Sequence, residues 1–570
     1  MGGAMAAANV AQRLDVDLLR VIPADARVVV ELGCGAGLTG EAYKRVNPHG
    51  VYVGVESDPD AANAAATRLD HVVVGDPSQI GAEHLPVDAA AVDCLVYNNV
   101  LERRADPWEL LRRQSAWLRP DTVVAAALWN VQHWGLLLQL LRGQWPYQAG
   151  GPLDRDNLRF FTLDSAQELF ARAGLNVFDV RVAQFVGNDF QQFQQLLAPL
   201  LKAMNLDAEQ FALRSSALQY IVRGRRAPLP GRRLRIHTMM MAPLACDRVR
   251  VLEPDQLTNT IPGVTATASV RTAQLTPPAP DEDRVFVIQR ANMRFPTDLG
   301  MLKELLQRNY LIVGEMDDDP DRWPEHAANR YVTFRGCHCV QTSTEPLANF
   351  LRELNPHVGV FPNHIASLPP PRVYRDAEPL RLFFGALNRE GDWAPVMPAL
   401  NRVLKEYKER VWVHVLHDQQ FFNALATPFK TFEPFSPYER YLEILHECEV
   451  ALLPLEPTRF NSMKSDLKFL ECSAHSVAVL ASPTVYEATV RDGETGLIYR
   501  GAEDFEAKLR ALLGDGGLRR GLAAKAYGWV KAGRLLSQHY RDRSAWYRRM
   551  IENLPQLQAD LRRRVPELFA

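Results

Sequence analysis

The first 225 residues alternate short apolar, β-branched runs with segments whose apolar residues recur every three or four positions. Arg27–Leu32 and Val51–Val55 are typical of buried parallel strands, and Val72–Val74 and Cys94–Tyr97 have the same character. Pro107–Leu118 has helical periodicity and begins with a proline, which suits a first helical turn. This alternation predicts a doubly wound α/β sheet.

The strand pattern ends at Ala217–Val222. Arg223–Arg233 follows, with two prolines, two glycines and several arginines, and we interpret it as a solvated linker. Alternation then resumes on both sides of a proline-rich break at Leu368–Pro371, which predicts two further α/β lobes. From about Leu518 the chain should be helical. The strands expected in these lobes are Leu234–His237, Val285–Ile288, Leu311–Val313, Cys339–Thr342, Leu380–Phe384, Val411–Val415, Val450–Leu453 and Val477–Ala481.

Composition narrows the class of protein. The chain has 570 residues, too many for one ordinary domain, and its 47% hydrophobic and 23% charged residues are ordinary for a globular protein. A net charge of −2 gives no basic field for nucleic acid. The seven scattered cysteines form no disulfide framework. We expect a cytoplasmic protein without a signal peptide or a transmembrane segment, and leave peripheral membrane contact open.

The most specific motif is VVVELGCGAG at Val28–Gly37, where a strand runs into a turn containing Gly33, Gly35 and Gly37. Glycines let the backbone turn sharply and let a ligand approach the main chain, and the following helix N-terminus presents free N–H groups. Nicotinamide dinucleotide sites use a similar spacing, so the glycines alone do not identify the ligand.

Three carboxylates favour S-adenosylmethionine (SAM) over a dinucleotide. Glu31 ends the first strand, where it can bind the ammonium group of an amino-acid tail. Glu56 ends the second strand, where it can accept hydrogen bonds from ribose hydroxyls. Asp76 ends the third strand and is placed to contact the adenine amino group.

With these motifs, residues 1–225 resemble class I SAM-dependent methyltransferases, especially those found beside polysaccharide-synthesis enzymes. The stretches at Val92–Pro120 and Asp154–Thr162 match in order as well. The alternative is a Rossmann domain that binds a nicotinamide cofactor or no ligand. The resemblance implies a SAM site made of Glu31, Gly33, Gly35, Gly37, Glu56, Asp76 and Asn98.

The sequence departs from that family near the expected methyl acceptor. Arg103 and Asn157 stand where such enzymes often carry histidine, and Trp129 replaces a proline before Asn130. We predict that Asn130 binds substrate and that His133 is the catalytic base. The alternative for His133 is an ordinary helix-face histidine.

A second constellation lies in Ser462–Tyr499. Lys464, Lys468 and Glu471 are one helical turn apart, so they are predicted to share one face. Cationic groups suit the diphosphate of a nucleotide sugar, and a carboxylate suits its ribose. The alternative is a solvated helix face of mixed charge.

Residues 234–550 resemble two-lobed GT-B glycosyltransferases of the large retaining family that uses nucleotide-sugar donors. FPNHI at Phe361–Ile365, FFGALNRE at Phe383–Glu390 and RDGETGLIY at Arg491–Tyr499 carry the resemblance. It implies that Glu471 binds ribose and that Arg389 grips the diphosphate. Met463 replaces the first of the family's paired glutamates, which shifts donor contacts to its neighbours. We therefore predict catalytic roles for Arg389, Lys464 and Lys468, and substrate contacts from Asn363, Asn388, Asn461, Ser465 and Glu471.

Two further motifs contain residue types that bind metal ions in other proteins. Asp317–Asp319 follows an apolar strand and resembles a metal-binding Asp-x-Asp, but we prefer a loop role at the cleft between the lobes. Cys337-His338-Cys339 has no second ligand pair at a suitable spacing, which favours a structural role over zinc. We expect no metal.

Together these observations predict an α/β protein with a Rossmann-like methyltransferase domain followed by a double-Rossmann GT-B glycosyltransferase. We expect it to glycosylate and methylate a glycan, with SAM as cofactor and a nucleotide sugar as donor. One alternative is an active glycosyltransferase with a silent SAM-binding domain, and another is a non-catalytic platform for polysaccharide assembly. The expected segments are the SAM domain (1–225), the linker (226–233), the acceptor lobe (234–372), the donor lobe (373–550) and a C-terminal tail (551–570).

Overall fold

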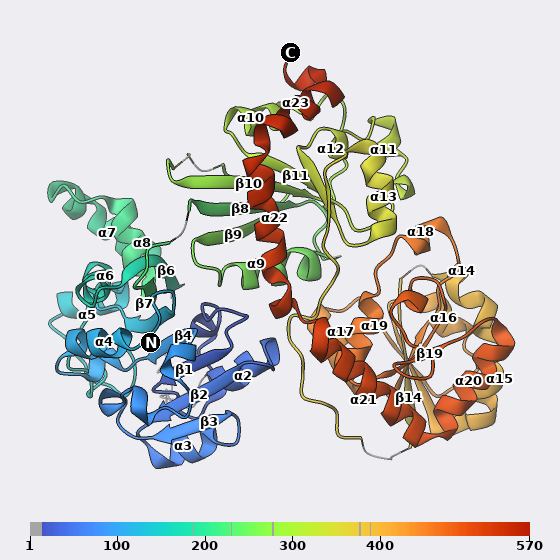
Figure 1. Cartoon of the computed structure of the whole chain (residues 1–570), viewed down its shortest axis with the longest axis horizontal. Helices are drawn as coiled ribbons and strands as arrows, with labels where there is room; N and C mark the ends of the chain where they lie inside the picture. The colour runs from blue at the N-terminus through green and yellow to red at the C-terminus, as the bar shows by residue number, and fades with distance from the viewer. Residues whose placement is uncertain are drawn as a thin grey trace. The chain divides into compact units, whose positions relative to one another are not determined.

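The computed structural model in Figure 1 describes residues 14–570, except positions 185, 188, 230, 245, 276, 278, 375–377 and 388. The chain forms two compact units. Residues 1–232 and 259–264 make up the N-terminal unit, and residues 233–258 and 265–570 make up the C-terminal unit.

The N-terminal unit is built on a seven-stranded sheet with the order β3-β2-β1-β4-β5-β7-β6. Strands β1 to β5 are parallel, and β7 runs antiparallel to β5 and β6. The strand order reverses between β1 and β4, the place where doubly wound sheets bind ligands. The strands are β1 (Val28–Leu32), β2 (Val51–Glu56), β3 (His71–Val74), β4 (Cys94–Asn98), β5 (Val123–Trp129), β6 (Asn176–Gln184) and β7 (Ala217–Arg225). The helices are α1 (Val16–Leu19), α2 (Leu38–Val46), α3 (Pro59–Ala65), α4 (Pro107–Ala116), α5 (Trp134–Leu141), α6 (Leu163–Arg172), α7 (Phe190–Ala203) and α8 (Ala208–Ser216).

Both faces of this sheet are covered, which explains why β1 is apolar along most of its length. Val30 and Leu32 pack into one core together with residues of α4 and α6, while Val29 packs into the other with α1 and α2. Helix α4 begins where its sequence predicts, because Asp106 caps its N-terminus and Pro107 fits the first turn. The predicted α/β fold of this unit is confirmed.

The interpretation of Arg223 as part of a solvated linker is wrong. Strand β7 continues through Arg225, and Arg223 is fully buried. Its guanidinium donates to Asp179 of β6 (2.6 and 3.0 Å) and to the main-chain carbonyls of Asn259 (3.0 Å) and Thr260 (3.0 Å). A buried charge needs such partners, and these bonds hold residues 259–264 within the N-terminal unit.

The first lobe of the C-terminal unit has a six-stranded sheet with the order β13-β12-β11-β10-β8-β9. From β8 through β10 to β13 the neighbouring strands pair in parallel. Its strands are β8 (Arg233–Met240), β9 (Val264–Val270), β10 (Glu282–Gln289), β11 (Leu311–Glu315), β12 (Cys339–Thr342) and β13 (Val358–Val360). Its helices are α9 (Glu253–Thr258), α10 (Leu299–Gln307), α11 (Glu325–Ala328), α12 (Val332–Arg335) and α13 (Glu345–Leu354).

The second lobe has another six-stranded sheet, entirely parallel, with the order β16-β15-β14-β17-β18-β19. Its strands are β14 (Leu380–Gly385), β15 (Val411–Leu416), β16 (Lys430–Glu433), β17 (Val450–Leu453), β18 (Ala478–Ala481) and β19 (Leu497–Ile498). Its helices are α14 (Glu390–Trp393), α15 (Met397–Tyr407), α16 (Gln419–Ala424), α17 (Tyr438–Glu447), α18 (Arg459–Ser462), α19 (Leu467–Ala474), α20 (Ala502–Gly514) and α21 (Gly516–Gly533). The predicted pair of Rossmann-like lobes is confirmed.

The chain crosses between the lobes twice, and the crossings are hydrogen-bonded to each other. The Ile365 N–H donates to the Arg534 carbonyl (2.9 Å), and the Leu536 N–H donates to the Ile365 carbonyl (2.8 Å). The Arg534 guanidinium also binds Asp466 (2.8 Å) and the Asn363 carbonyl (3.1 Å). These bonds make residues 363–365 and 534–536 the hinge of the C-terminal unit.

After the second crossing, the chain returns to the first lobe. Helix α22 (Tyr540–Glu552) runs along that lobe, followed by α23 (Leu554–Arg564), as the red segment of Figure 1 shows. Residues 551–570, which we expect to form a tail, instead pack against it: Leu561, Val565 and Leu568 are buried in one core with α10. Leu561 lies in α23, Val565 follows the end of that helix, and Leu568 ends the short 3-10 turn Pro566–Leu568.

Candidate functional site

The glycine turn after β1 has a backbone that only glycine adopts readily. Gly33, Gly35 and Gly37 all have positive φ angles, of 77°, 53° and 79°. A Cβ added to Gly33 would lie 2.7 Å from Cγ2 of Val100 and 2.8 Å from the carbonyl oxygen of Asn98. The turn therefore fits closely against the end of β4, as the predicted SAM loop requires.

A cavity of about 450 Å³ opens beside this turn. Gly33 and Gly35 form one wall, Glu56 and Asp58 a second, and Asn98 lies at the end of β4. Its size is that of ordinary small-molecule sites. The geometry brings together four of the residues predicted to bind SAM, namely Gly33, Gly35, Glu56 and Asn98, at the reversal of strand order.

Glu56 ties the glycine turn to the end of β2. Its carboxylate accepts hydrogen bonds from the main-chain N–H groups of Gly35 (2.8 Å), Ser57 (2.8 Å) and Asp58 (3.0 Å). The carboxylate also lines the cavity, so its remaining lone pairs can face a ligand. This is the arrangement expected of a group that accepts hydrogen bonds from ribose.

Glu31 lies behind the cavity rather than in its wall. It is fully buried, and its two carboxylate oxygens accept hydrogen bonds from the Tyr52 hydroxyl (2.9 Å) and the Asn98 amide (2.9 Å). Asn98 does line the cavity. Glu31 therefore reaches the cavity wall through Asn98, and its predicted contact with the ligand stays a prediction. Burial raises the pKa of Glu31 from 4.5 to about 7.

This raised pKa predicts a pH-dependent stability that Glu31→Gln removes. The folded state keeps a proton that the unfolded state releases between pH 4.5 and about 7, so stability falls with rising pH across that window and levels off above it. The loss is at most about 1.4 kcal/mol per pH unit. Urea unfolding of wild type and Glu31→Gln from pH 4.5 to 8 measures the difference. Parallel pH profiles for the two proteins would refute the assignment.

Asp76 stands at the rim of this region. Its carboxylate accepts a hydrogen bond from the Ser78 N–H (2.8 Å) and forms an ion pair with Arg104 (2.8 Å). Arg104 and Pro77 line the cavity, but Asp76 does not. An adenine amino group would have to compete with Arg104 for this carboxylate, so the predicted adenine contact stays a prediction.

Asn130 and His133 are not among the residues that line the cavity, and the structure gives both other roles. The buried Asn130 amide donates to the carbonyls of Ala217 (2.7 Å) and Arg214 (3.0 Å), which fixes the chain after β5 against β7. His133 is buried at the start of α5, with its ring 5.7 Å from that of Trp134. The predicted substrate contact of Asn130 and the predicted catalytic role of His133 stay predictions, and neither residue lines this cavity.

Three side chains that were not predicted as ligand contacts line the cavity. Arg103, Gln148 and Asp154 line the cavity, and Arg103 contacts the Asp154 carboxylate at 3.4 Å. The substitution of Arg103 for the family's histidine was the available signal. Gln148 belongs to a loop without periodicity, which gave no signal. Asp154 begins the stretch Asp154–Thr162, which was part of the resemblance but was given no ligand role.

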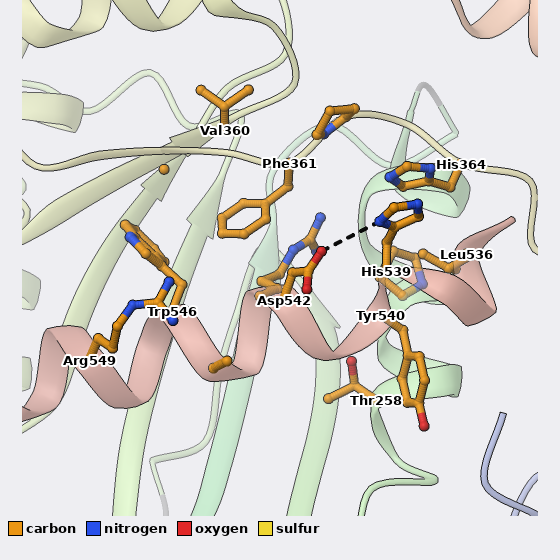
Figure 2. Close-up of a pocket in the computed structure, with 15 residues that line it drawn as sticks. Thr258, Val360, Phe361, His364, Leu536, His539, Tyr540, Asp542, Trp546 and Arg549 are labelled. Carbon is orange, nitrogen blue, oxygen red and sulfur yellow. Dashed lines mark ion pairs between the residues drawn. The ribbon is translucent and has the colours of Figure 1, made fainter. Parts of the chain in front are cut away.

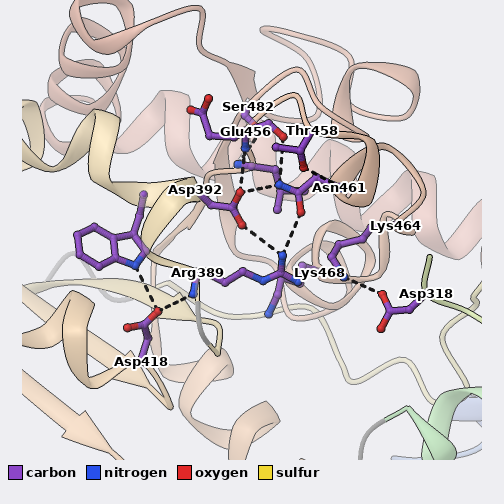
Figure 3. A network of polar contacts seen from close by, with 12 residues as sticks. Asp318, Arg389, Asp392, Asp418, Glu456, Thr458, Asn461, Lys464, Lys468 and Ser482 are labelled. Atoms are coloured by element: carbon purple, nitrogen blue, oxygen red, sulfur yellow. Dashed lines mark hydrogen bonds and ion pairs between the residues drawn. The ribbon is translucent and has the colours of Figure 1, made fainter. Parts of the chain in front are cut away.

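In the second lobe, Arg389 is the centre of a polar network (Figure 3). One of its terminal nitrogens contacts Asp392 (3.3 Å) and Asn461 (3.0 Å). Asp392, which sequence reasoning missed, also accepts bonds from the Asn461 amide (2.6 Å) and the Glu456 N–H (3.1 Å). The i, i+3 spacing of Arg389 and Asp392 was a usable signal. Arg389 and Asn461, predicted to act on the same donor, are therefore brought together.

The two predicted lysines have different surroundings. Lys464 precedes α19 and is not on the helical face of Lys468 and Glu471, because α19 begins only at Leu467. Its ammonium forms an ion pair with Asp318 of the first lobe (2.8 Å), and burial lowers its pKa. Lys468 lies in α19 and donates to the Gly385 carbonyl, and burial lowers its pKa as well. Asp317–Asp319 thus has the predicted role of a loop at the cleft between the lobes.

Glu471 is buried in α19 near Lys468. The hydroxyls of Tyr438 and Tyr441 each donate to one of its carboxylate oxygens, both at 2.8 Å. Burial raises its pKa, and the neighbouring Lys468 opposes that shift. The two tyrosines, one turn apart in α17, fix the carboxylate but leave it further lone pairs for a ribose.

The remaining predicted donor contacts lie at the hinge. The Asn363 amide donates to the Ser465 hydroxyl (2.8 Å), and Arg250 donates to the Asn363 side-chain oxygen (3.0 Å). The structure therefore joins Asn363 and Ser465 across the lobes. Asn388 lies outside the described residues.

Cys337, His338 and Cys339 are buried in the first lobe. The His338 Nδ1 accepts a hydrogen bond from the Ile312 N–H (3.0 Å), as expected of a structural histidine. Within the part of the chain that the structure describes, no three His, Cys, Asp or Glu side chains are arranged to hold a metal ion. Over the same residues, none of the helices combines the length and apolar character that a membrane crossing demands.

Comparison with known proteins identifies the N-terminal domain. Residues 7–180 match the methyltransferase domain family, which confirms that resemblance and assigns this part of the chain to transferases. An uncharacterized methyltransferase of Mycolicibacterium gilvum is 33% identical over 103 residues, 18% of this chain and 39% of that protein. A ubiquinone biosynthesis O-methyltransferase of Cereibacter sphaeroides is 25% identical over 174 residues, 30% of this chain and 69% of that protein. The chain spans only 27% and 39% of the length of the first curated relatives.

Among solved structures, a glycosyltransferase from Rickettsia africae is similar to this chain, with 12% identity and a TM-score of 0.41. The match covers 56% of this chain and 99% of that one. The two-lobed architecture given above rests on the chain's own sheets.

Proposed function

From a domain of the methyltransferase family followed by two Rossmann-like lobes, we propose an enzyme that both methylates and glycosylates a glycan. SAM is the methyl donor and a nucleotide sugar is the glycosyl donor. The observation that carries the proposal is the presence of two built sites in one chain: the cavity at Gly33–Gly37 and the Arg389 network.

The N-terminal site supports SAM binding by its shape and its acceptors. Glycines at positive φ let the ligand approach the main chain, and Glu56 offers a carboxylate at the end of β2. Asn98, held by Glu31, offers an amide at the end of β4. When bound, SAM would supply an electrophilic methyl group, and these residues would orient it.

The C-terminal site supports transfer from a nucleotide sugar by its charge. Arg389 and Lys468 lie beside the ends of β14 and α19, where positive groups can stabilise the departing diphosphate. Glu471 supplies the carboxylate for ribose, and Asn461 and Ser465 supply polar contacts. No metal is part of this proposal.

If both activities are joined in one chain, an acceptor modified at one site would be at a raised effective concentration for the other site. We place this work in the cytoplasm, in line with seven cysteines that are all unpaired and mostly buried.

A second candidate is a glycosyltransferase whose SAM domain binds its cofactor without turnover. It is favoured by the placement of Asn130 and His133 away from the cavity and by Arg103 in its wall. Among the described residues that line the cavity there is no histidine to act as a base near neutral pH.

A ligand screen followed by turnover assays separates these functions. The melting temperature of the full chain should rise with SAM and with one class of nucleotide sugar. At a ligand concentration a hundredfold above Kd, the free energy of unfolding should increase by about 2.7 kcal/mol. Methyl transfer from labelled SAM to glycan acceptors then distinguishes an active from a silent domain. Nucleotide binding without sugar release would indicate an assembly platform, and a chain that binds neither ligand would refute the proposal.

A further inference from the structure

A second cavity, of about 420 Å³, lies in the C-terminal unit at the hinge between its lobes (Figure 2). One wall is formed by residues 359–364, which lead out of β13, and the other by residues 536–549, which lead into α22. Figure 2 shows His364 lying over His539, with Phe361 toward the middle of the cavity. None of the residues assigned above to methyl or glycosyl transfer lines it.

The cavity has two arginines in its lining. Arg543 and Arg549 line it, and neither forms an ion pair with any carboxylate of the described residues. The one carboxylate in the lining is that of Asp542, which pairs with His539 at 3.5 Å. Burial lowers the pKa of Arg543, yet a guanidinium stays charged in proteins. The carboxylates of Glu315 and Asp255 offset part of this shift in Arg543, and neither lines the cavity. An anion entering the cavity could therefore bind two guanidinium groups that have no direct ion-pair partner among the described residues.

The rest of the lining is aromatic and suits a ligand whose uncharged part is flat or apolar. Phe361 and Trp546 meet edge to face, with ring centroids 5.5 Å apart. His364 stacks on His539 at 4.1 Å, with 10° between the ring planes. The Nδ1 atom of His364 is enclosed and has no hydrogen-bond partner in the described chain. Burial and nearby positive groups lower the pKa of His364 to about 3, so its neutral ring can exchange one hydrogen bond with a ligand.

We propose that this hinge cavity binds a small organic anion, with its phosphate or carboxylate group on Arg543 and Arg549. Its apolar or planar body lies against Phe361 and Trp546. The volume matches that of ordinary ligand sites. Charge-assisted hydrogen bonds to two arginines supply the affinity, and the aromatic wall discriminates among anions.

The cavity is connected by hydrogen bonds to Asn363, one of the residues predicted to contact the sugar donor. Arg543 donates to the Arg250 carbonyl (2.8 Å), and the Arg250 guanidinium donates to the Phe361 carbonyl (2.6 Å) and to Asn363 (3.0 Å). A ligand on Arg543 therefore sits one side chain away from the contact between Asn363 and Ser465.

Titration of the full chain with phenyl phosphate, inorganic phosphate and benzamide tests the proposal by calorimetry. Phenyl phosphate should bind with a stoichiometry of one per chain. Inorganic phosphate should bind about tenfold more weakly, and benzamide should show no measurable binding. Arg543→Gln and Arg549→Gln should each weaken phenyl phosphate binding by about tenfold or more. Lys525→Gln, which removes an exposed charge elsewhere in the same unit, should leave binding unchanged.

The Arg389→Ala variant separates this site from the donor site. Phenyl phosphate binding that persists in Arg389→Ala and is lost in Arg549→Gln supports the hinge cavity. Loss in Arg389→Ala alone assigns the signal to the donor site and overturns the proposal. No saturable binding to wild type, or equal binding of benzamide, overturns it as well. The Arg549 side chain is exposed and forms no hydrogen bond or ion pair with the described residues, so its replacement should leave the fold intact. Arg549→Gln therefore decides the question even if Arg543→Gln unfolds.

Discussion

Glu56→Ala is expected to weaken SAM binding by about a hundredfold or more, because two hydrogen bonds from ribose hydroxyls to a carboxylate are lost. The same change frees the Gly35 N–H, so the glycine turn also loses the contact that ties it to β2. The freed N–H groups lie at the edge of the cavity, where water can bond them, and the fold should be retained. Calorimetric titration with SAM measures the affinity.

Two variants serve as controls. Glu56→Gln keeps one acceptor oxygen without the charge and should fall between wild type and alanine. Glu83→Gln changes a carboxylate whose side chain is 74% exposed and which does not line the cavity, so it should bind SAM normally. Equal SAM affinity in wild type and Glu56→Ala would remove Glu56 from the site.

The strand-and-glycine pattern was sufficient to predict the N-terminal fold, since parallel strands buried on both faces have continuous apolar runs. The partners of buried charges were not predictable in the same way. Arg223 looked solvated among other arginines, and its carboxylate, Asp179, lies 44 residues away on the neighbouring strand. Non-local pairings of this kind have no periodic signal in one sequence.

The same reason explains why the partners of Asn130 and Lys464 were not predicted. Asn130 has the residue type and position of a substrate contact, but the carbonyls it binds belong to Ala217 and Arg214, far along the chain. Lys464 was placed on a helix by its spacing from Lys468. In the structure it instead reaches Asp318 of the other lobe, an interaction that depends on how the two lobes close.

The contact between Arg389 and Asn461 could be anticipated, because both lie in segments that follow the ends of neighbouring strands. Arg389 comes after β14 and Asn461 after β17, and adjacent parallel strands bring such positions together. The sequence did not predict the carboxylates that hold these side chains in place. Asp392 orients both side chains, and Asp418 accepts a bond from the Trp393 indole (3.2 Å) in the same network.

Arg389→Ala is expected to lower the rate of sugar release from the nucleotide donor by about a hundredfold or more, the usual cost of removing one group that stabilises a developing anion. Only one terminal nitrogen of the Arg389 guanidinium is bonded to Asp392 and Asn461 in the described chain. The other N–H groups can therefore bind diphosphate oxygens as a fork. Asp392 keeps its bonds from Asn461 and the Glu456 N–H, so the local fold should survive.

Arg389→Lys retains the charge but replaces the planar fork with a single point donor, and should recover only part of the lost rate. Arg402→Ala removes an arginine whose side chain is 55% exposed and paired with Glu506, and should leave turnover unchanged. Steady-state kinetics on all three variants, with the donor found in the ligand screen, separates affinity from rate. Because diphosphate charge grows as the sugar departs, the loss should appear mainly in kcat rather than in KM. An unchanged kcat/KM in Arg389→Ala would show that the diphosphate is held elsewhere.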